Sequence, residues 1–279
     1  MVHDPGVATD PVQAGTLDVD GSRIAWWTAG TGPGTPWLLL HGGGAHAGWW
    51  RPMAAVVRGR PVVALDLSGH GRSGSRERYS YQGWAQELVA VAGEVCGGPV
   101  VVVAHSMHGR TGVAAAARHP DAVAGLVLLD TIIPTRSGEP DPRRPGGPVR
   151  QPTREDALRR FRLRPGTGLV DPAILSVLAE ESVVQDAGGW TFAFDPRTFE
   201  AADLVSINGL VHRVRCPVAV VRGSLSAIAT PPMAAEFSAA LGRPVVRAEV
   251  PGTDHHMMLE DPEGTARVLG ASVRALRIR

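Results

Sequence analysis

The sequence predicts an α/β fold built on a doubly wound, mostly parallel sheet, and two patterns along the chain favour it. The apolar runs are short, and several are continuous rather than alternating, as expected for strands covered on both faces. Helical stretches separate these runs, so strands and helices alternate along the chain. With 279 residues and a hydrophobic content of 44%, the chain can bury the core of one large α/β domain or two smaller ones.

The expected elements follow one another in a regular order. The predicted strands are the apolar runs at residues 24–27, 37–40, 62–65, 100–104, 126–129, 218–221 and 245–250. The predicted helices lie at residues 49–57, 81–95, 107–118, 232–241 and 262–276. Pro262 begins the last helix, where its missing N–H costs no hydrogen bond.

One long segment interrupts the alternation. From residue 133 to about 215 no strand rhythm is visible, and residues 134–152 are rich in proline and glycine. A capping box at Thr153-Arg-Glu-Asp156 predicts a helix that runs to about Arg164, and further helices are expected near residues 172–181 and 199–213. We therefore predict a helical cap at 133–215, inserted between core segments 15–132 and 216–279.

The predicted cap is rich in aromatic residues. Trp190, Phe192, Phe194 and Phe199 fall within a short stretch of it. They either form a small core of the cap itself or line an apolar substrate pocket, and both interpretations stay open at this point.

Composition excludes several classes of protein. The formal net charge is +1, so nothing indicates a nucleic-acid or anionic-membrane partner. The chain has no lysine, which excludes a Schiff-base lysine, a Walker lysine and a Ser-Lys pair. Cys96 and Cys216 lack the spacing of a disulfide framework or a metal site. We see no signal peptide and no apolar run of the ~18 residues that span a bilayer, and we expect a cytoplasmic protein.

The sharpest motif is a serine that follows an apolar strand. In Val100-Val-Val-Val-Ala-His-Ser106-Met-His-Gly-Arg110 the strand runs directly into Ser106 and then into a helix of small residues. A nucleophile elbow needs this arrangement, because a strained turn exposes the serine hydroxyl above the sheet. The usual G-x-S-x-G pattern is altered at both ends, with Ala104 before the serine and His108 after it.

Two further motifs supply the remaining groups that acyl transfer requires. Leu38-Leu-Leu-His41-Gly-Gly-Gly44 closes a strand with glycines, which let backbone N–H groups approach a reacting carbonyl. Near the C-terminus, His255 and His256 lie in a loop after the last strand, where a catalytic base is expected. Adjacent histidine side chains diverge and no H-E-x-x-H spacing is present, so we expect no metal.

With these motifs in this order, the chain resembles the α/β-hydrolase superfamily over nearly its whole length. The matching residues are Leu40-His41-Gly42-Gly43-Gly44, Asp66-Leu-Ser-Gly-His-Gly-Arg-Ser73, Ala104-His-Ser106-Met107 and Gly252-Thr-Asp-His255. The resemblance implies an α/β-hydrolase fold with a helical cap insertion. Gly69-His-Gly-Arg-Ser-Gly74 mimics a dinucleotide fingerprint, but the family uses this segment as a structural turn and no helix opens there, so we expect no cofactor.

The catalytic acid departs from the commonest family pattern. Most relatives carry it after the strand at 218–221, yet no carboxylate occurs here between Gly223 and Glu236. The alternative family position is the end of the preceding strand, which in this chain is Asp130. This arrangement resembles that of zearalenone-type lactonases, and a cap for a neighbouring turn is the structural alternative for Asp130.

The expected roles follow from these assignments. Ser106 attacks a carbonyl, His255 accepts its proton, and Asp130 orients the imidazole. The N–H groups of Gly43 and Met107 form the oxyanion hole. The candidates for the substrate pocket are His41, Gly42, His108 and Trp190.

The sequence thus predicts a serine esterase or lactonase that acts on a small to medium, largely apolar organic molecule. One alternative is a cofactor-independent dioxygenase or lyase, in which the His-Asp pair abstracts a proton and Ser106 only hydrogen-bonds. The histidines in His105-Ser-Met-His108 favour that reading, whereas the glycine-rich oxyanion loop favours the hydrolase. A further alternative is a binding protein that retains the triad as a ligand pocket.

Overall fold

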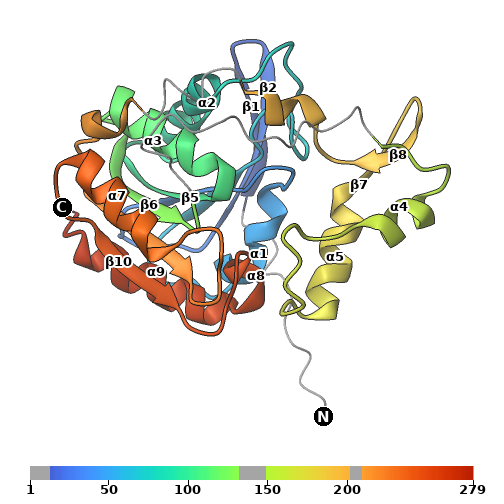
Figure 1. The fold of residues 1–279 in the computed structure, drawn as a ribbon. Helices are drawn as coiled ribbons and strands as arrows, with labels where there is room; N and C mark the ends of the chain where they lie inside the picture. Colours follow the sequence, from blue (N-terminus) through green and yellow to red (C-terminus); the bar gives the residue numbers. More distant parts are fainter. Residues whose placement is uncertain (1–12, 132–148, 202–208, 279) are drawn as a thin grey trace.

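The computed structural model describes residues 13–131, 149–201 and 209–278, and it has the predicted α/β architecture. Eight strands form one sheet in the order β1-β2-β4-β3-β5-β6-β9-β10, with helices on both faces (Figure 1). The pairs β1–β2 and β2–β4 are antiparallel and the other pairs are parallel. The strands are β1 (Gln13–Val19), β2 (Ser22–Ala29), β3 (Trp37–Leu40), β4 (Val62–Leu65), β5 (Val100–His105), β6 (Val123–Leu129), β9 (Val218–Gly223) and β10 (Val246–Val250).

Most helices of the core occupy the segments in which the sequence predicts them, whereas α8 lies in the stretch before Pro262, where the sequence predicts a loop. The Ser80 hydroxyl accepts a hydrogen bond from the Gly83 N–H and so caps α2, while Asp261 and Pro262 begin α9. The helices are η1 (Ala47–Trp50), α1 (Arg51–Ala54), α2 (Tyr81–Glu94), η2 (Ser106–His108), α3 (Gly109–Arg118), α7 (Pro231–Leu241), α8 (Met257–Glu260) and α9 (Pro262–Ala275).

The sheet separates two hydrophobic cores, which explains the continuous apolar runs. Along β5 and β6 the buried side chains alternate between the two faces. Val102 and Leu126 belong to the core beneath α2, α3 and α7, whereas Val103 and Val127 belong to the core beneath α1, α8 and α9. A strand that must be apolar on both faces leaves no polar alternation in the sequence.

The segment between β6 and β9 differs in part from the prediction. It contains the expected helices α4 (Arg154–Arg160) and α5 (Pro172–Ser182), but also an unpredicted antiparallel hairpin of β7 (Val183–Asp186) and β8 (Gly189–Phe192). The expectation of no strand here is wrong because β7 and β8 are short and largely solvent-accessible, so they lack a buried apolar run. Most of the proline-rich stretch at 134–152 lies outside the described residues.

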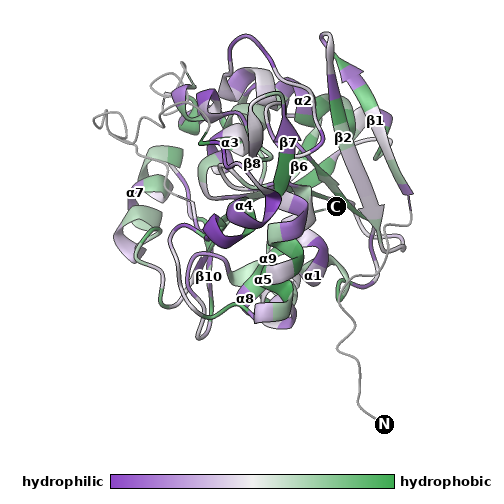
Figure 2. Ribbon diagram, turned by 90° about the vertical axis from the view of Figure 1, so that its right-hand side faces the viewer, coloured by the Kyte–Doolittle hydropathy of each residue, from purple (hydrophilic) through white to green (hydrophobic). Residues whose placement is uncertain are grey.

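The predicted helix at 199–213 is also only partly described. Short 3₁₀ helices, η3 (Pro196–Glu200) and η4 (Val211–Arg213), lie at its two ends, and residues 202–208 lie outside the described part of the chain. In Figure 1 α4, α5, β7 and β8 stand to one side of the sheet. Figure 2 shows α4 as hydrophilic along most of its length, and Ala157 is its one buried residue.

Backbone hydrogen bonds join the inserted segment to the loop that follows β4. The Asp195 N–H donates to Gly69 O and the Gly71 N–H donates to Ala193 O, both at 2.7 Å. The Tyr79 hydroxyl donates to Asp195 Oδ2 at 2.9 Å. Residues 193–195 are therefore held against the loop at 69–74.

A buried ion pair supports the same loop from the other side. Glu87 on α2 is fully buried, and its carboxylate accepts hydrogen bonds from the Ser68 N–H and from Arg76 Nε, each at 2.8 Å. Arg76 also donates to Val19 O at 2.7 Å. Burial raises the pKa of Glu87, while its bonds to Ser68 and Arg76 oppose that shift.

We expect Arg76→Met to lower the free energy of unfolding by about 3 kcal/mol, because it leaves the Glu87 carboxylate buried without its cation. Urea denaturation measures the change. Arg78→Met is the matched control, since Arg78 is an exposed neighbour, and it should change stability by less than about 0.5 kcal/mol. Equal stabilities of the two variants would contradict this account.

Candidate active site

Ser106 lies at the turn between β5 and α3, in a backbone conformation that side chains rarely adopt. Its φ is +53°, in the left-handed region. The turn is tightly packed, because a Cβ atom on Gly109 would lie 2.2 Å from Thr131 Cγ2 and one on Gly112 would lie 2.8 Å from Leu126 Cδ1. The close approach of helix and strand is therefore made by the glycines at 109 and 112, one and four places after His108.

His255 lies in the turn between β10 and α8 and contacts Ser106 directly. Its Nε2 is 2.9 Å from Ser106 Oγ, and its Nδ1 is 2.6 Å from Asp130 Oδ2. With the proton on Nδ1, the imidazole donates to the carboxylate and accepts from the serine hydroxyl. The His255 carbonyl accepts a hydrogen bond from His105 Nε2 at 2.9 Å, which places His105 behind the turn.

Asp130 occupies the end of β6 and is fully buried. Its φ is +44°, and its N–H donates to Val221 O at 2.8 Å, so the turn is anchored to β9. The Ser226 hydroxyl donates to Asp130 Oδ2 at 2.6 Å, and the Ile228 N–H donates to Ser226 Oγ at 3.0 Å. Asp130 is therefore held by His255 and by the turn after β9.

Ser226 is a site residue that the sequence analysis does not identify. It lies in the turn where the sequence shows no carboxylate, and it supports the acid of the neighbouring strand instead. The absence of a carboxylate in that turn is the only sequence signal that points to it.

The two residues expected to form the oxyanion hole lie next to each other. A Cβ atom on Gly43 would lie 3.0 Å from Met107 Sδ, and one on Gly42 would lie 3.3 Å from Ser106 Cβ. The loop therefore contacts the elbow closely, and a side chain at either position would have to displace its neighbours. Among the hydrogen bonds of the described residues, neither the Gly43 N–H nor the Met107 N–H has a protein acceptor.

Of the other expected pocket residues, two histidines are buried near the oxyanion loop and the elbow, and the tryptophan lies on the inserted hairpin. His41 is buried, donates from Nδ1 to Gly42 O at 2.8 Å and accepts at Nε2 from the Leu67 N–H, so it braces the oxyanion loop. His108 is also buried, and its Nδ1 lies 3.1 Å from Thr111 Oγ1. Trp190 lies on β8 and pairs through its backbone with Gln151, and no described contact joins it to Ser106.

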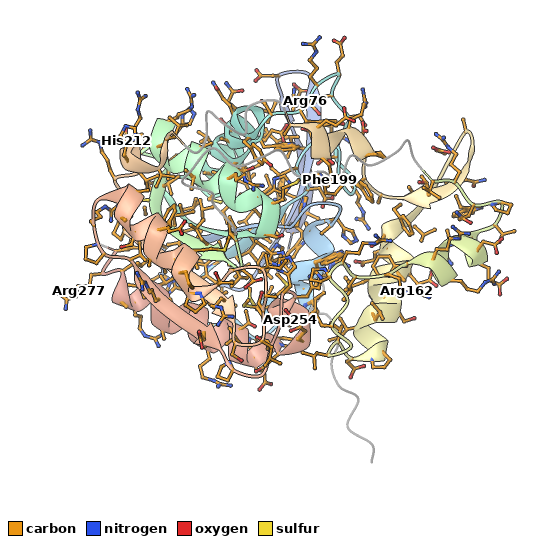
Figure 3. All side chains as sticks on the ribbon, in the orientation of Figure 1. Arg76, Arg162, Phe199, His212, Asp254 and Arg277 are labelled. Carbon is orange, nitrogen blue, oxygen red and sulfur yellow. The ribbon has the colours of Figure 1, made fainter. Side chains whose placement is uncertain are left out.

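The aromatic residues of the inserted segment divide between the two roles considered for them. The ring of Phe192 packs against Phe161, with centroids 6.1 Å apart, inside the insertion. Phe199 and Phe194 pack against each other at 5.8 Å and lie beside Gly44 of the oxyanion loop (Figure 3 labels Phe199). These two rings form an apolar wall beside the oxyanion loop.

His256 does not join its neighbour at the serine. Its Nε2 lies 3.1 Å from Pro165 O, on the inserted segment, and burial lowers its pKa to about 3. The two adjacent histidines therefore contact different parts of the chain.

Among the described residues, no helix is both long and apolar enough to span a membrane.

Comparison with known sequences identifies related proteins. The model of the alpha/beta hydrolase family matches residues 37–268. Esterase Rv0045c of Mycobacterium tuberculosis is 38% identical over 131 residues, which are 46% of this chain and 41% of that protein. Lipase LipV of the same organism is 38% identical over 96 residues, 34% of this chain and 37% of the lipase. The alignments thus span about two fifths of these relatives.

Longer matches are more distant. The 2-(acetamidomethylene)succinate hydrolase of Mesorhizobium japonicum is 26% identical over 277 residues, covering 90% of this chain and 92% of that protein. Among solved structures, the thioesterase domain from the curacin biosynthetic pathway superposes with a TM-score of 0.76 at 21% identity, covering 93% of this chain and 99% of that domain. The crystal structure of Esterase Rv0045c gives 0.76 at 23% identity, covering 95% of this chain and 92% of that one. At these identities the structural matches show the fold alone.

The strained turn predicts an unusual ranking of stabilities at position 106. We expect Ser106→Gly to be more stable than Ser106→Ala by about 1 kcal/mol, because only glycine adopts a φ of +53° without strain. Thermal denaturation of the two variants measures the difference. Thr111, inside α3, is the control position: there the alanine variant should be more stable than the glycine variant. If Ser106→Ala were more stable than Ser106→Gly, the turn at position 106 would not be strained.

Proposed function

This chain belongs to the alpha/beta hydrolase family, and from that membership we propose that it is a serine hydrolase that cleaves ester bonds through an acyl-enzyme. The observation that carries the proposal is the unbroken path of hydrogen bonds from Ser106 Oγ through His255 to Asp130, at 2.9 and 2.6 Å. The relatives named as an esterase and a lipase support ester cleavage.

The proposed reaction begins at the serine. Ser106 Oγ attacks the carbonyl carbon of the ester while His255 Nε2 takes the hydroxyl proton. The Asp130 carboxylate, fixed by Ser226, stabilises the imidazolium that forms. The free N–H groups of Gly43 and Met107 donate to the oxygen that becomes negative in the tetrahedral intermediate.

The second half of the reaction uses the same groups. His255 gives its proton to the leaving alcohol oxygen, which releases the alcohol and leaves the acyl group on Ser106. A water molecule then attacks the acyl carbon, with His255 again as the base, and the acid is released. A lactone would follow the same steps but yield one hydroxy acid in place of two products.

The surroundings of Ser106 favour an apolar substrate. Phe194 and Phe199 cover one side of the oxyanion loop. A cavity of about 570 Å³ shares Phe194 with this wall, but its lining includes charged residues such as Asp186 and Arg197 and does not include Ser106, so it is not assigned to the substrate. We propose that the apolar part of the substrate lies against the rings of Phe194 and Phe199.

A fluorophosphonate probe tests the role of the serine. We expect one covalent adduct per chain on Ser106, detected by intact mass, because only an activated serine reacts with this probe. Ser106→Ala should show no adduct and lose nearly all single-turnover activity, as should His255→Ala. Ser226→Ala, which keeps the nucleophile and the base, is the control that should still be labelled.

The alternative mechanism makes a different prediction for the same variants. If the His255–Asp130 pair only abstracts a proton for a reaction with oxygen, Ser106 supplies one hydrogen bond and Ser106→Ala loses at most about tenfold. Rates measured with and without oxygen distinguish the two cases. A Ser106→Ala enzyme that stays active and consumes oxygen would refute the acyl-enzyme.

Asp130 contacts His255 directly, whereas Ser226 acts on it through Asp130, so the two residues should differ in their effect on kcat. We expect Asp130→Asn to lower kcat by about 10⁴, because the amide favours the wrong imidazole tautomer. Ser226→Ala removes one hydrogen bond to a charged group and should cost between about 10-fold and 100-fold. Steady-state kinetics on a p-nitrophenyl ester measures both, and a fully active Asp130→Asn variant would refute the assignment of the acid.

A further inference from the structure

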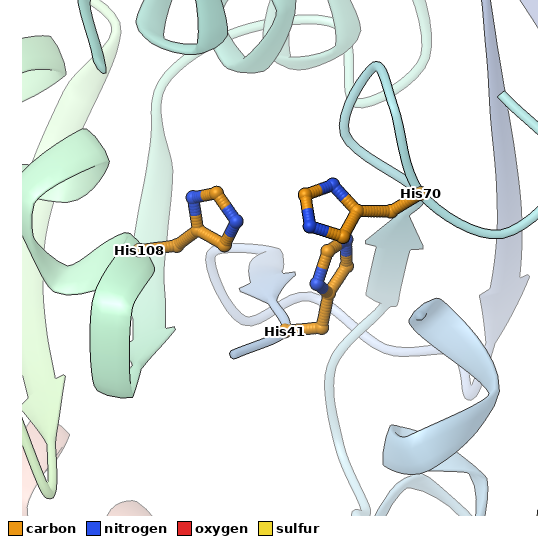
Figure 4. Close-up of side chains that lie close together, drawn as sticks. All are labelled: His41, His70 and His108. Atoms are coloured by element: carbon orange, nitrogen blue, oxygen red, sulfur yellow. The ribbon is translucent and has the colours of Figure 1, made fainter. Parts of the chain in front are cut away.

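Three histidines from separate parts of the chain meet below the oxyanion loop and the elbow (Figure 4). His41 follows β3, His70 lies in the loop after β4, and His108 ends η2. Their ring centroids are 4.7 to 5.3 Å apart, and one ring nitrogen from each lies within 4.8 Å of the other two. We call these residues the histidine cluster; each is at most 1% exposed.

The hydrogen bonds of the histidine cluster determine which nitrogens carry protons. The Nδ1 atoms of His41 and His70 contact the carbonyl oxygens of Gly42 and Ser68, at 2.8 and 3.3 Å. A carbonyl oxygen only accepts, so these Nδ1 atoms are protonated and each Nε2 atom carries a lone pair. His108 Nδ1 lies 3.1 Å from the Thr111 hydroxyl, which can donate or accept, so a lone pair on His108 Nε2 requires that the hydroxyl accept.

The Nε2 atoms lack matching donors. Those of His70 and His108 are buried and have no hydrogen-bond partner among the described residues. The ring of Trp84 packs against His108 at 4.7 Å, but its N–H donates to Ser68 O instead. His41 Nε2 accepts only one long bond, from the Leu67 N–H at 3.2 Å.

Buried lone pairs without partners are unfavourable, so the cluster calls for a group that accepts electron pairs. Burial lowers the pKa of all three imidazoles, with that of His70 and of His108 well below the usual range. Neutral imidazole nitrogens are the form that binds metal ions.

We propose that the histidine cluster binds one late first-row transition-metal ion, such as Zn²⁺, through the Nε2 atoms of His41, His70 and His108. Imidazole nitrogens suit Zn²⁺, Cu²⁺ and Ni²⁺. In such sites the second ring nitrogen typically donates to a carbonyl or similar acceptor, as the Nδ1 atoms of His41 and His70 do here. Zn–N bonds of ~2.0–2.1 Å require the rings to close on the ion, which replaces the long bond from Leu67 to His41.

One side of the cluster borders a cavity. His70, together with Gly69, Gly71 and Phe194, lines the cavity of about 570 Å³ described above. The three imidazoles themselves are buried, so an ion from that cavity would reach them through a local opening of the structure. A bound ion would join the end of β3, the loop at 69–74 and the elbow helix η2, which begins at Ser106.

The second group of neighbouring histidines is a poorer site. In the group His105, His255 and His256, both ring nitrogens of His255 are occupied by Ser106 and Asp130. His105 Nε2 is also engaged, with the His255 carbonyl. This group does not offer three free lone pairs, and it serves as the internal control.

The test uses the full chain, freed of metal with a chelator and titrated with Zn²⁺ by calorimetry. We expect one equivalent to bind, and the melting temperature to rise because the ion binds the folded state. His70→Gln and His108→Gln should each weaken binding by at least about tenfold. His212→Gln, at an exposed position (Figure 3), and His256→Gln should bind as the unaltered protein does.

Two further measurements make the outcome decisive. Circular dichroism establishes whether each variant is folded. If His70→Gln does not fold, the binding test uses His108→Gln. The absorption spectrum with Co²⁺ distinguishes nitrogen ligands from Cys96 or Cys216, since only thiolates give an intense ultraviolet charge-transfer band. The proposal is overturned by absence of one-equivalent binding, by thiolate bands, or by undiminished binding in both cluster variants.

Discussion

The buried carboxylate of Asp130 is the constraint on which the arrangement around Ser106 depends. A fully buried charge is costly unless it is paired and hydrogen-bonded, and here the partners are His255 and Ser226. Each partner belongs to a different turn, so the turns after β9 and β10 must both reach the end of β6. The parallel register makes this possible, because it aligns the carboxyl ends of β5, β6 and β9 at one edge of the sheet.

The oxyanion loop is held in a comparable way by close packing. Glycines at 42 and 43 let it contact Ser106 and Met107, while His41 fastens it to the loop after β4 through Leu67. Backbone bonds then tie that second loop to residues 193–195 of the insertion. Phe194 is thus connected to the elbow through a chain of backbone hydrogen bonds and close contacts.

The sequence predicts elements well where burial imposes a pattern. The parallel strands are covered on both faces, so their continuous apolar runs were readable, and Ser106, Asp130 and His255 follow from motifs at strand ends. β1, β7 and β8 are exposed on at least one side, and their patterns are too weak to stand out. Ser226 and the histidine cluster depend on contacts between distant segments, and no local spacing in the sequence records such contacts.

The position of Ser226 also bears on how such sites change during evolution. Its Oγ donates to Oδ2 of Asp130, the carboxylate oxygen that His255 also contacts, so the turn after β9 already reaches the position of the proposed acid. A lineage that exchanged the residues at positions 130 and 226 would move the proposed acid from one strand end to its neighbour. The order serine, acid, histidine along the chain would be unchanged, and so would the sheet beneath these residues.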